Sequence, residues 1–141
     1  FIRSGKLFVP IQAEPDRTET KIADTLSPLE KIVGEDASDM AIFKAEDYNG
    51  YKFPFGLNEM TLVGQPVLLV GNPGLQGFTA REGIISHINN KIWITPLVIG
   101  GDSGSAVVNR DDFTLIGLVS GKWNEYFTNI VPIDSYKPYL K

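Results

Sequence analysis

The stretch Ile99-Gly100-Gly101-Asp102-Ser103-Gly104-Ser105-Ala106-Val107-Val108 decides the fold prediction. It sets Gly-Gly-Asp-Ser-Gly between two apolar runs typical of β-strands, so its centre predicts a tight loop with the Ser103 hydroxyl at the tip. Glycines on both sides permit unusual backbone angles and leave room for a ligand. A loop of this kind can direct two backbone N–H groups at one point beside the hydroxyl. That is the geometry of an oxyanion hole next to a nucleophilic serine.

Length and composition bound the class of protein. The 141 residues suffice for one medium domain or two very small ones that share a core. A net charge of −4 argues against a general nucleic-acid binder, and no apolar run approaches the ~20 residues of a membrane span. The absence of cysteine excludes disulfides, thiolate zinc sites and a cysteine nucleophile, and a cytoplasmic location is predicted. No carboxylate–histidine cluster has metal-ligand spacing, so neither a metal nor another cofactor is expected.

The second half of the chain has the more regular strand pattern. Six apolar runs are separated by turn signals, with Asn89-Asn90 as a two-residue hairpin signal. Six such strands suit a small closed antiparallel barrel. The expected strands are Gln65–Val70, Glu82–Ile88, Lys91–Ile99, Ser105–Asn109, Leu115–Ser120 and Phe127–Pro132, followed by a short helix within Asp134–Lys141.

The first half offers about four strands, joined to the second by the aromatic and Gly/Pro-rich segment Asp47–Leu57. The expected strands are Lys6–Pro10, Thr20–Leu26, Leu29–Val33 and Met40–Lys44. The chain starts inside what looks like a strand, so its natural N-terminus is expected further upstream.

These motifs resemble those of the chymotrypsin-like serine proteases. The resemblance rests on Gly101–Ser105, on Ile116-Gly117-Leu118-Val119-Ser120-Gly121 shortly after it, and on Phe127-Thr128-Asn129-Ile130 as the closing strand. Asp36-Ala37-Ser38-Asp39-Met40-Ala41-Ile42-Phe43-Lys44 resembles the segment with the catalytic aspartate. Val70-Gly71-Asn72-Pro73 and Glu82-Gly83-Ile84-Ile85-Ser86 look like strands of HtrA/Deg-type members, and the resemblance covers roughly residues 36–134.

The resemblance implies an all-β fold of two antiparallel six-stranded β-barrels, 1–57 and 58–141, with one or two strands of the first barrel missing before Phe1. It also implies that Ser103 is the nucleophile and that Asp39 orients the base, with Asp36 and Asp47 as weaker rivals. The N–H groups of Gly101 and Ser103 would form the oxyanion hole. A serine hydroxyl needs a neighbouring base to take its proton, and that base needs a carboxylate to fix its tautomer.

The base is missing from its expected place. The single histidine, His87, falls in a predicted strand of the second half. The family places its catalytic histidine before the aspartate, so we interpret His87 as a structural or surface residue. The run from Leu7 to Gln12 resembles the strand that precedes the family's histidine, and Ala13 stands in the histidine slot. Position 13 is substituted, or the protein is a natural pseudo-enzyme, or the histidine lies before Phe1. Each alternative predicts almost no hydrolytic activity for the chain as printed.

The resemblance also places the pocket for the substrate side chain before the scissile bond. Its walls would be Leu97, Val98 and Ile99 on one side and Val119-Ser120-Gly121-Lys122 on the other. The backbone from Ser120 to Lys122 would pair with an extended substrate. Glu125 and Lys122 carry opposite charges near this pocket, so they indicate no single preference, and a solvated hairpin tip explains them equally well. Gly71-Asn72-Pro73-Gly74-Leu75-Gln76-Gly77 lacks the Lys-Ser/Thr ending of a phosphate loop and is predicted to be a turn.

The sequence therefore predicts a serine endopeptidase that acts through an acyl-enzyme on Ser103, with a polypeptide substrate. Its small size favours the compact proteases that process viral polyproteins, which would place it in the host cytoplasm. The Gly-Asn-Pro and Gly-Ile-Ile-Ser segments favour a bacterial Deg-like quality-control protease instead. A third hypothesis is a protease-fold module that binds or scaffolds without cutting.

Overall fold

The computed structural model describes residues 2–3, 6–9, 21–22, 25–26, 31–35, 40–44, 56–122 and 124–135. Up to residue 44 the description covers strands and their pairing. From residue 56 onward it also covers side chains, apart from those of Leu75 and Ser135.

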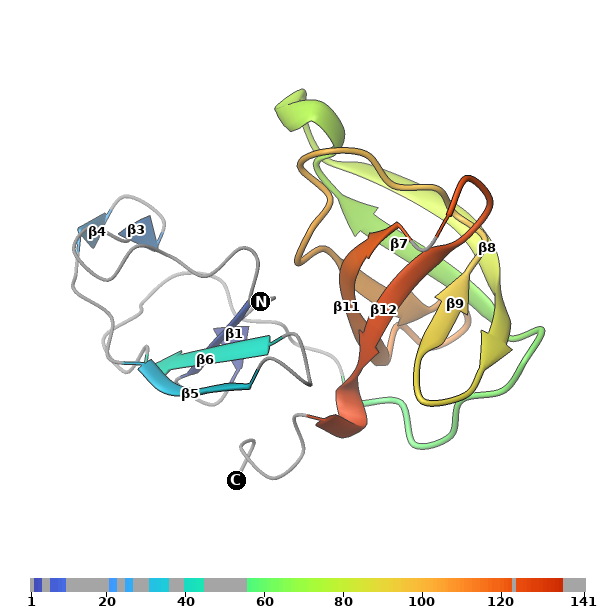
Figure 1. Ribbon diagram of the computed structural model, residues 1–141, viewed down its shortest axis with the longest axis horizontal. Helices are drawn as coiled ribbons and strands as arrows, with labels where there is room; N and C mark the ends of the chain where they lie inside the picture. The colour runs from blue at the N-terminus through green and yellow to red at the C-terminus, as the bar shows by residue number, and fades with distance from the viewer. Residues whose placement is uncertain are drawn as a thin grey trace.

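Six antiparallel strands of the second half close into a barrel in the order β10-β11-β12-β9-β8-β7 (Figure 1, right). Closure gives each strand two neighbours and so leaves no edge open to solvent. The strands are β7 (Pro66–Gly71), β8 (Thr79–Ile88), β9 (Ile92–Ile94), β10 (Ala106–Asn109), β11 (Leu115–Lys122) and β12 (Thr128–Pro132).

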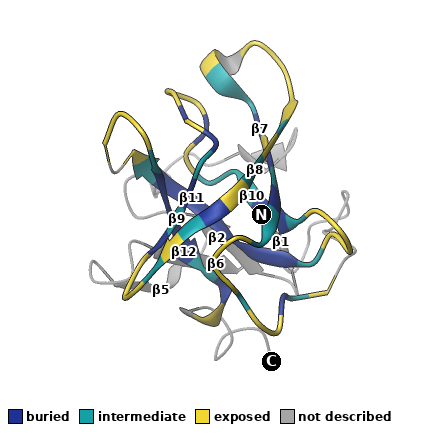
Figure 2. Cartoon of the chain, turned by 90° about the vertical axis from the view of Figure 1, so that its right-hand side faces the viewer, coloured by how far each residue is buried: buried dark blue, intermediate teal, exposed yellow. Residues whose placement is uncertain are grey.

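The interior of the barrel is filled by β-branched and leucine side chains from every strand. Buried residues lie in all six strands of the barrel (Figure 2). In β7 they alternate with more exposed ones, so that Val67 and Leu69 are buried, whereas β11 is buried over its first six residues. The main cluster consists of Val67, Leu69, Ile85, Ile92, Ile94, Val98, Val107, Ile116, Val119 and Ile130. This closed barrel confirms the prediction from the six runs.

Two strand predictions need correction. The expected strand Lys91–Ile99 is only three residues long, because after Ile94 the chain leaves the ladder at Thr95-Pro96 and proline has no N–H to donate. The expected strand Thr20–Leu26 is two short strands, β3 (Lys21–Ile22) and β4 (Thr25–Leu26), that pair with each other as a hairpin.

The other described strands of the first half form a four-stranded antiparallel sheet in the order β1-β2-β6-β5 (Figure 1, left). Its strands are β1 (Ile2–Arg3), β2 (Lys6–Val9), β5 (Lys31–Glu35) and β6 (Met40–Lys44). Strands β2, β5 and β6 overlap the expected strands Lys6–Pro10, Leu29–Val33 and Met40–Lys44, but β5 begins and ends two residues later than expected. A closed first barrel and the division at residue 57 stay predictions.

Two short 3-10 turns complete the described elements. The turn η3 (Pro73–Leu75) follows β7, and η4 (Ile133–Ser135) follows β12. The rest of the predicted C-terminal helix, 136–141, lies outside the described residues. None of the described helical segments is long and apolar enough to cross a membrane.

Candidate active site

The predicted nucleophile loop joins β9 to β10 and contains a tight turn. The Asp102 N–H donates to the Ile99 carbonyl oxygen at 3.1 Å, which closes a four-residue turn. Gly101 has φ +97° at the third position of that turn, whereas Gly100 has no positive φ. This pattern marks a type II β-turn, which needs glycine at its third position.

Some backbone N–H groups of this loop donate hydrogen bonds and others do not. The Gly104 N–H donates to the Val119 oxygen at 2.8 Å, and the Ser105 N–H donates to the Asp102 oxygen at 2.9 Å. The N–H groups of Gly101 and Ser103 donate to no acceptor in the part of the chain that the structure describes. Ser103 itself is exposed. An exposed hydroxyl flanked by two uncommitted N–H groups is what the predicted oxyanion hole requires.

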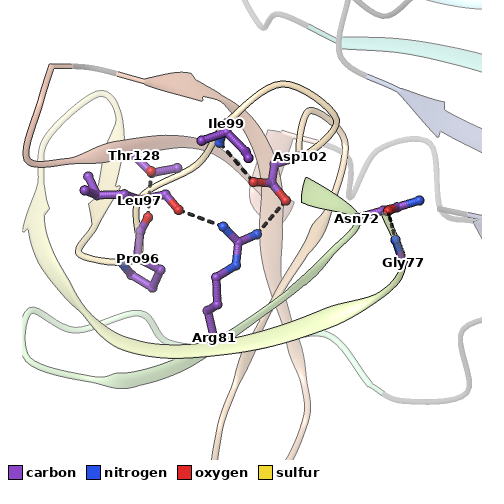
Figure 3. Close-up of polar contacts among 8 residues, drawn as sticks. All are labelled: Asn72, Gly77, Arg81, Pro96, Leu97, Ile99, Asp102 and Thr128. Carbon is purple, nitrogen blue, oxygen red and sulfur yellow. Dashed lines mark hydrogen bonds and ion pairs between the residues drawn. The ribbon is translucent and has the colours of Figure 1, made fainter. Parts of the chain in front are cut away.

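Asp102 anchors the loop from beneath. Its side chain is fully buried, and its Oδ1 accepts a hydrogen bond and ion pair from Arg81 Nη2 of β8 at 2.5 Å (Figure 3). Its Oδ2 accepts the Ile99 N–H at 3.0 Å. The same guanidinium donates through Nη1 to the Leu97 carbonyl oxygen at 2.7 Å. Arg81 therefore holds both ends of the segment 97–102, and it supplies the cation that a buried carboxylate needs.

Gly71, at the end of β7, packs against the other side of Asp102. A side-chain carbon at position 71 would lie 2.5 Å from both Asp102 Oδ1 and Ser105 Oγ. Only glycine lets the strand pass so close to this carboxylate.

Sequence reasoning missed both anchors of Asp102. The sequence does contain a usable signal. An aspartate that is buried in a loop between two apolar strands needs a cation beside it, and the barrel strands contain few lysines and arginines. The second half of the chain up to residue 135 contains only Arg81, Lys91, Arg110 and Lys122 as lysine or arginine.

The predicted pocket segments come together beside the loop. The Gly104–Val119 bond, together with a 2.9 Å bond from the Val119 N–H to the Ser105 oxygen, places the loop against β11 just before Ser120. Ser120 is buried, and Gly121 pairs with Asn129 after a register shift in the strand. On the other side, Thr128 Oγ1 donates to the Pro96 oxygen at 2.7 Å, which ties the chain before Leu97 to β12 (Figure 3).

The remaining pocket residues differ in exposure. Leu97 is exposed, but the Val98 side chain packs in the barrel core, so any wall at position 98 is made by its backbone. Lys122 and Glu125 are both exposed, as a solvated hairpin tip would have them. The substrate-pocket assignment of these residues stays a prediction.

The carboxylate and base of the predicted triad lie outside the described residues. Asp39 directly precedes β6, and neither it, its rivals Asp36 and Asp47, nor Ala13 is described. His87 is exposed on β8, and its ring lies against Trp93 of β9 with centroids 4.7 Å apart. Within the described ranges no group of three His, Asp or Glu side chains could hold a metal ion.

Comparisons with known proteins agree with this geometry. The chain is 30% identical over 154 aligned residues to the "Serine protease HtrA-like" proteins of Staphylococcus aureus strains USA300 and NCTC 8325, with 89% of this chain aligned. It spans only 20% of the length of these curated relatives.

Two solved protease structures share the fold. The serine endoprotease from Yersinia pestis superposes with a TM-score of 0.79 at 23% identity, over 97% of this chain and 53% of that one. The Rv3671c protease from M. tuberculosis, in its active form, gives a TM-score of 0.78 at 17% identity, over 99% and 69% of the two chains. The family model of the trypsin-like peptidase domain matches residues 11–118. With the exposed Ser103 and its two uncommitted N–H groups in the matching fold, the chain belongs to the trypsin-like peptidase family of serine proteases.

Proposed function

We propose that this domain is the catalytic domain of an HtrA/Deg-type serine endopeptidase, with Ser103 as its nucleophile. The observation that carries the proposal is the exposed Ser103 hydroxyl between backbone N–H groups that donate to nothing among the described residues. Arg81 and Gly71 hold the loop in this form from below.

The proposed reaction divides peptide hydrolysis into two steps. Ser103 Oγ attacks the scissile carbonyl while a base takes its proton, and the resulting oxyanion accepts hydrogen bonds from the N–H groups of Gly101 and Ser103. The amine leaves with that proton and the acyl group stays on Ser103. Water activated by the same base then releases the acid. Asp39 would orient the base, which is predicted to occupy position 13.

Activity assays test the proposal and the position of the base together. We expect the chain as printed to cleave casein and fluorogenic peptides negligibly, because Ala13 stands where the base is expected. We expect Ala13→His to gain cleavage. Loss of that cleavage on adding Ser103→Ala would tie it to the nucleophile. Adding His87→Gln should leave it unchanged, because His87 lies against Trp93.

A second arm does not depend on position 13. Peptides that carry a histidine at successive positions around the scissile bond can bring their own imidazole to Ser103. The unmodified chain should cleave some of these peptides but not matched glutamine peptides. If Ala13→His is inert while a histidine peptide is cleaved, position 13 is the wrong slot. If neither arm shows Ser103-dependent cleavage, the protease proposal fails.

The substrate class follows from the relatives. We propose unfolded polypeptides, since the similar curated proteins are HtrA-like and bacterial. Processing of a viral polyprotein stays a prediction. Cleavage of unfolded casein at many sites would favour the first substrate class, whereas cleavage at one defined junction would favour the second.

A binding module of protease fold is the second candidate. It is favoured by the single histidine of the printed sequence, which is exposed and lies against the Trp93 ring at an interplanar angle of 37°. A fluorophosphonate probe separates the candidates, because labelling at Ser103 requires an activated hydroxyl. Labelling of Ala13→His supports the enzyme. Absence of labelling, combined with retained binding of unfolded polypeptide, supports the module.

A further inference from the structure

One buried amide of the barrel has a hydrogen-bonding atom without a partner and no part in the proposed reaction. Asn129 of β12 is 9% exposed, and its Oδ1 is buried and accepts no hydrogen bond from the described residues. A buried amide oxygen in this state has lost its bonds to water without replacing them, which destabilises the fold. A donor from outside the described residues would remove that penalty.

Asn129 lies on the outer face of the barrel. The next residue, Ile130, belongs to the core cluster, and side chains alternate along a strand, so Asn129 faces outward. The strands β9, β12 and β11 lie side by side (Figure 1). Asn129 pairs with Trp93 of β9 on one side and with Gly121 of β11 on the other, so these three residues share the outer face.

The outer face is bare at Gly121. A side-chain carbon at position 121 would have nothing within 4 Å apart from the adjoining residues. The φ of Gly121 is not positive, so its backbone conformation does not require glycine. Neither packing nor conformation explains a glycine at this position, whereas a passage for a side chain from another molecule would.

The end of β11 has a ladder partner on one side only. Although the barrel is closed, β10 pairs with β11 only up to Leu118, and the loop before β10 bonds to it as far as Val119. Gly121 and Lys122 pair with β12 alone in the described ladders. The substrate of the proposed reaction would add along this edge as an antiparallel strand. Its residue opposite Gly121 would then turn its side chain to the outer face.

Reach and polarity decide which substrate side chain can pair with Asn129. Two strand spacings, roughly 10 Å, separate Asn129 from a substrate residue opposite Gly121, so only a long side chain crosses the bare glycine. The Phe127 ring stacks on Trp93 at 5.9 Å, and these neighbours on the outer face carry no charge that could pair with a buried ion. A neutral primary amide can donate to Oδ1 and accept from Nδ2. Glutamine fits both the length and the polarity.

We propose that Asn129 is a specificity-determining residue, which selects a glutamine of the substrate at the position opposite Gly121. This inference rests on the proposed function, because it takes the peptide substrate of that proposal. Selection is a property of binding, however, so it can be measured without cleavage.

The test titrates the unmodified chain with extended peptides that carry glutamine at each position in turn. Matched peptides carry methionine there, which has nearly the same length but no amide. We expect glutamine to bind about fivefold to tenfold more tightly than methionine, and only at one position or at two positions separated by one residue. The side-chain amide resonances of Asn129 should shift with the glutamine peptide. Equal binding, a preference at every position, or tighter binding of lysine than of glutamine overturns the proposal.

Three variants separate the amide from its surroundings. Asn129→Leu keeps the approximate shape, and it should abolish the preference for glutamine without lowering the urea midpoint, because it removes an unpaired buried group. His87→Leu is the matched control, since His87 lies on the opposite side of Trp93 from Asn129, and it should keep the preference. Gly121→Ala should weaken glutamine and methionine peptides alike, because its methyl group obstructs the passage. A lower urea midpoint for Asn129→Leu would assign the amide a structural role and overturn the proposal.

This inference and the proposed function can fail separately. Selection of glutamine without Ser103-dependent cleavage in either assay contradicts the protease and supports the role of Asn129. Cleavage through Ser103 without selection of glutamine supports the protease and overturns the role of Asn129. If the chain binds none of the peptides, the pairing along β11 is wrong and the inference falls with it.

Discussion

Asp102 carries a carboxylate into the barrel next to the proposed nucleophile, and its neighbours account for its burial. Arg81 neutralises the charge, the Ile99 N–H uses the second oxygen, and Gly71 leaves the space. Arg81 and Gly71 come from distant parts of the sequence, and the bonds of Arg81 to Leu97 and Asp102 restrain the segment that precedes Ser103.

We expect Arg81→Met to destabilise the protein by about 2 kcal/mol, because it leaves a buried carboxylate without its cation. The Arg81 side chain is 27% exposed, so water partly screens the pair and the loss falls below that of a fully buried one. Urea unfolding measures the difference. Adding Asp102→Asn to Arg81→Met should recover part of the loss, because the unpaired charge is removed.

Arg110→Met is the matched control, since its ion pairs with Glu82 and Asp111 are both 3.7 Å long and exposed. It should cost less than about 0.5 kcal/mol. Equal losses of stability for the two arginine variants would show that the Arg81–Asp102 pair stabilises the protein no more than an exposed ion pair does.

Asp112 gives a pH-dependent test at the residue scale. The hydroxyl and backbone N–H of Thr114 donate to its Oδ1 at 2.7 and 3.0 Å. They favour the ionised form and lower the pKa of Asp112 from its ordinary value of 3.8. Because the folded pKa is depressed, this stability is present above pH 3.8 and is lost as the pH falls through the folded value.

The measurement compares urea midpoints of the parent and Asp112→Asn between about pH 6 and pH 2. The parent should lose more stability than the variant below pH 3.8, since the amide accepts the same bonds without titrating. Parallel curves would show that Thr114 does not discriminate between the two forms of the carboxyl.

At the scale of elements, β7 and β8 do more than complete the barrel. The end of β7 makes room for Asp102, β8 supplies Arg81, and in the loop between them the Gly74 N–H donates to the Gly100 oxygen. The loop from β9 to β10 carries Ser103, and this neighbouring hairpin contacts it at Leu97, Gly100 and Asp102.

At the scale of the whole molecule, the closed barrel is the frame of the site. Its core is continuous across all six strands, so a cavity in it should weaken the frame as a unit. We expect Ile116→Ala, at a fully buried position, to cost about 2–5 kcal/mol in urea unfolding. Leu62→Ala, at a position 53% exposed, should cost less than about 1 kcal/mol. Similar losses would mean that Ile116 does not belong to the core.

Local sequence patterns predicted much of the barrel and of the nucleophile loop. Strand periods and turn residues identified the six barrel strands, because alternation of apolar side chains is a property of neighbouring residues. They overextended the strand after Lys91, since Pro96 and the apolar residues that follow belong to a loop that packs like a strand. The turn at the glycines and serine of the loop was equally predictable, because turn formation depends on residues adjacent in sequence.

By itself, the sequence determined most of the barrel strands and a glycine-rich loop with the Ser103 hydroxyl at its tip. Only the tertiary structure decided that Arg81 pairs with Asp102, that Gly71 lies against the same carboxylate, and that Gly74 bonds to Gly100. The physical reason is range. Backbone preference depends on adjacent residues, whereas an ion pair or a hydrogen bond between loops depends on strand register, which only the closed barrel defines.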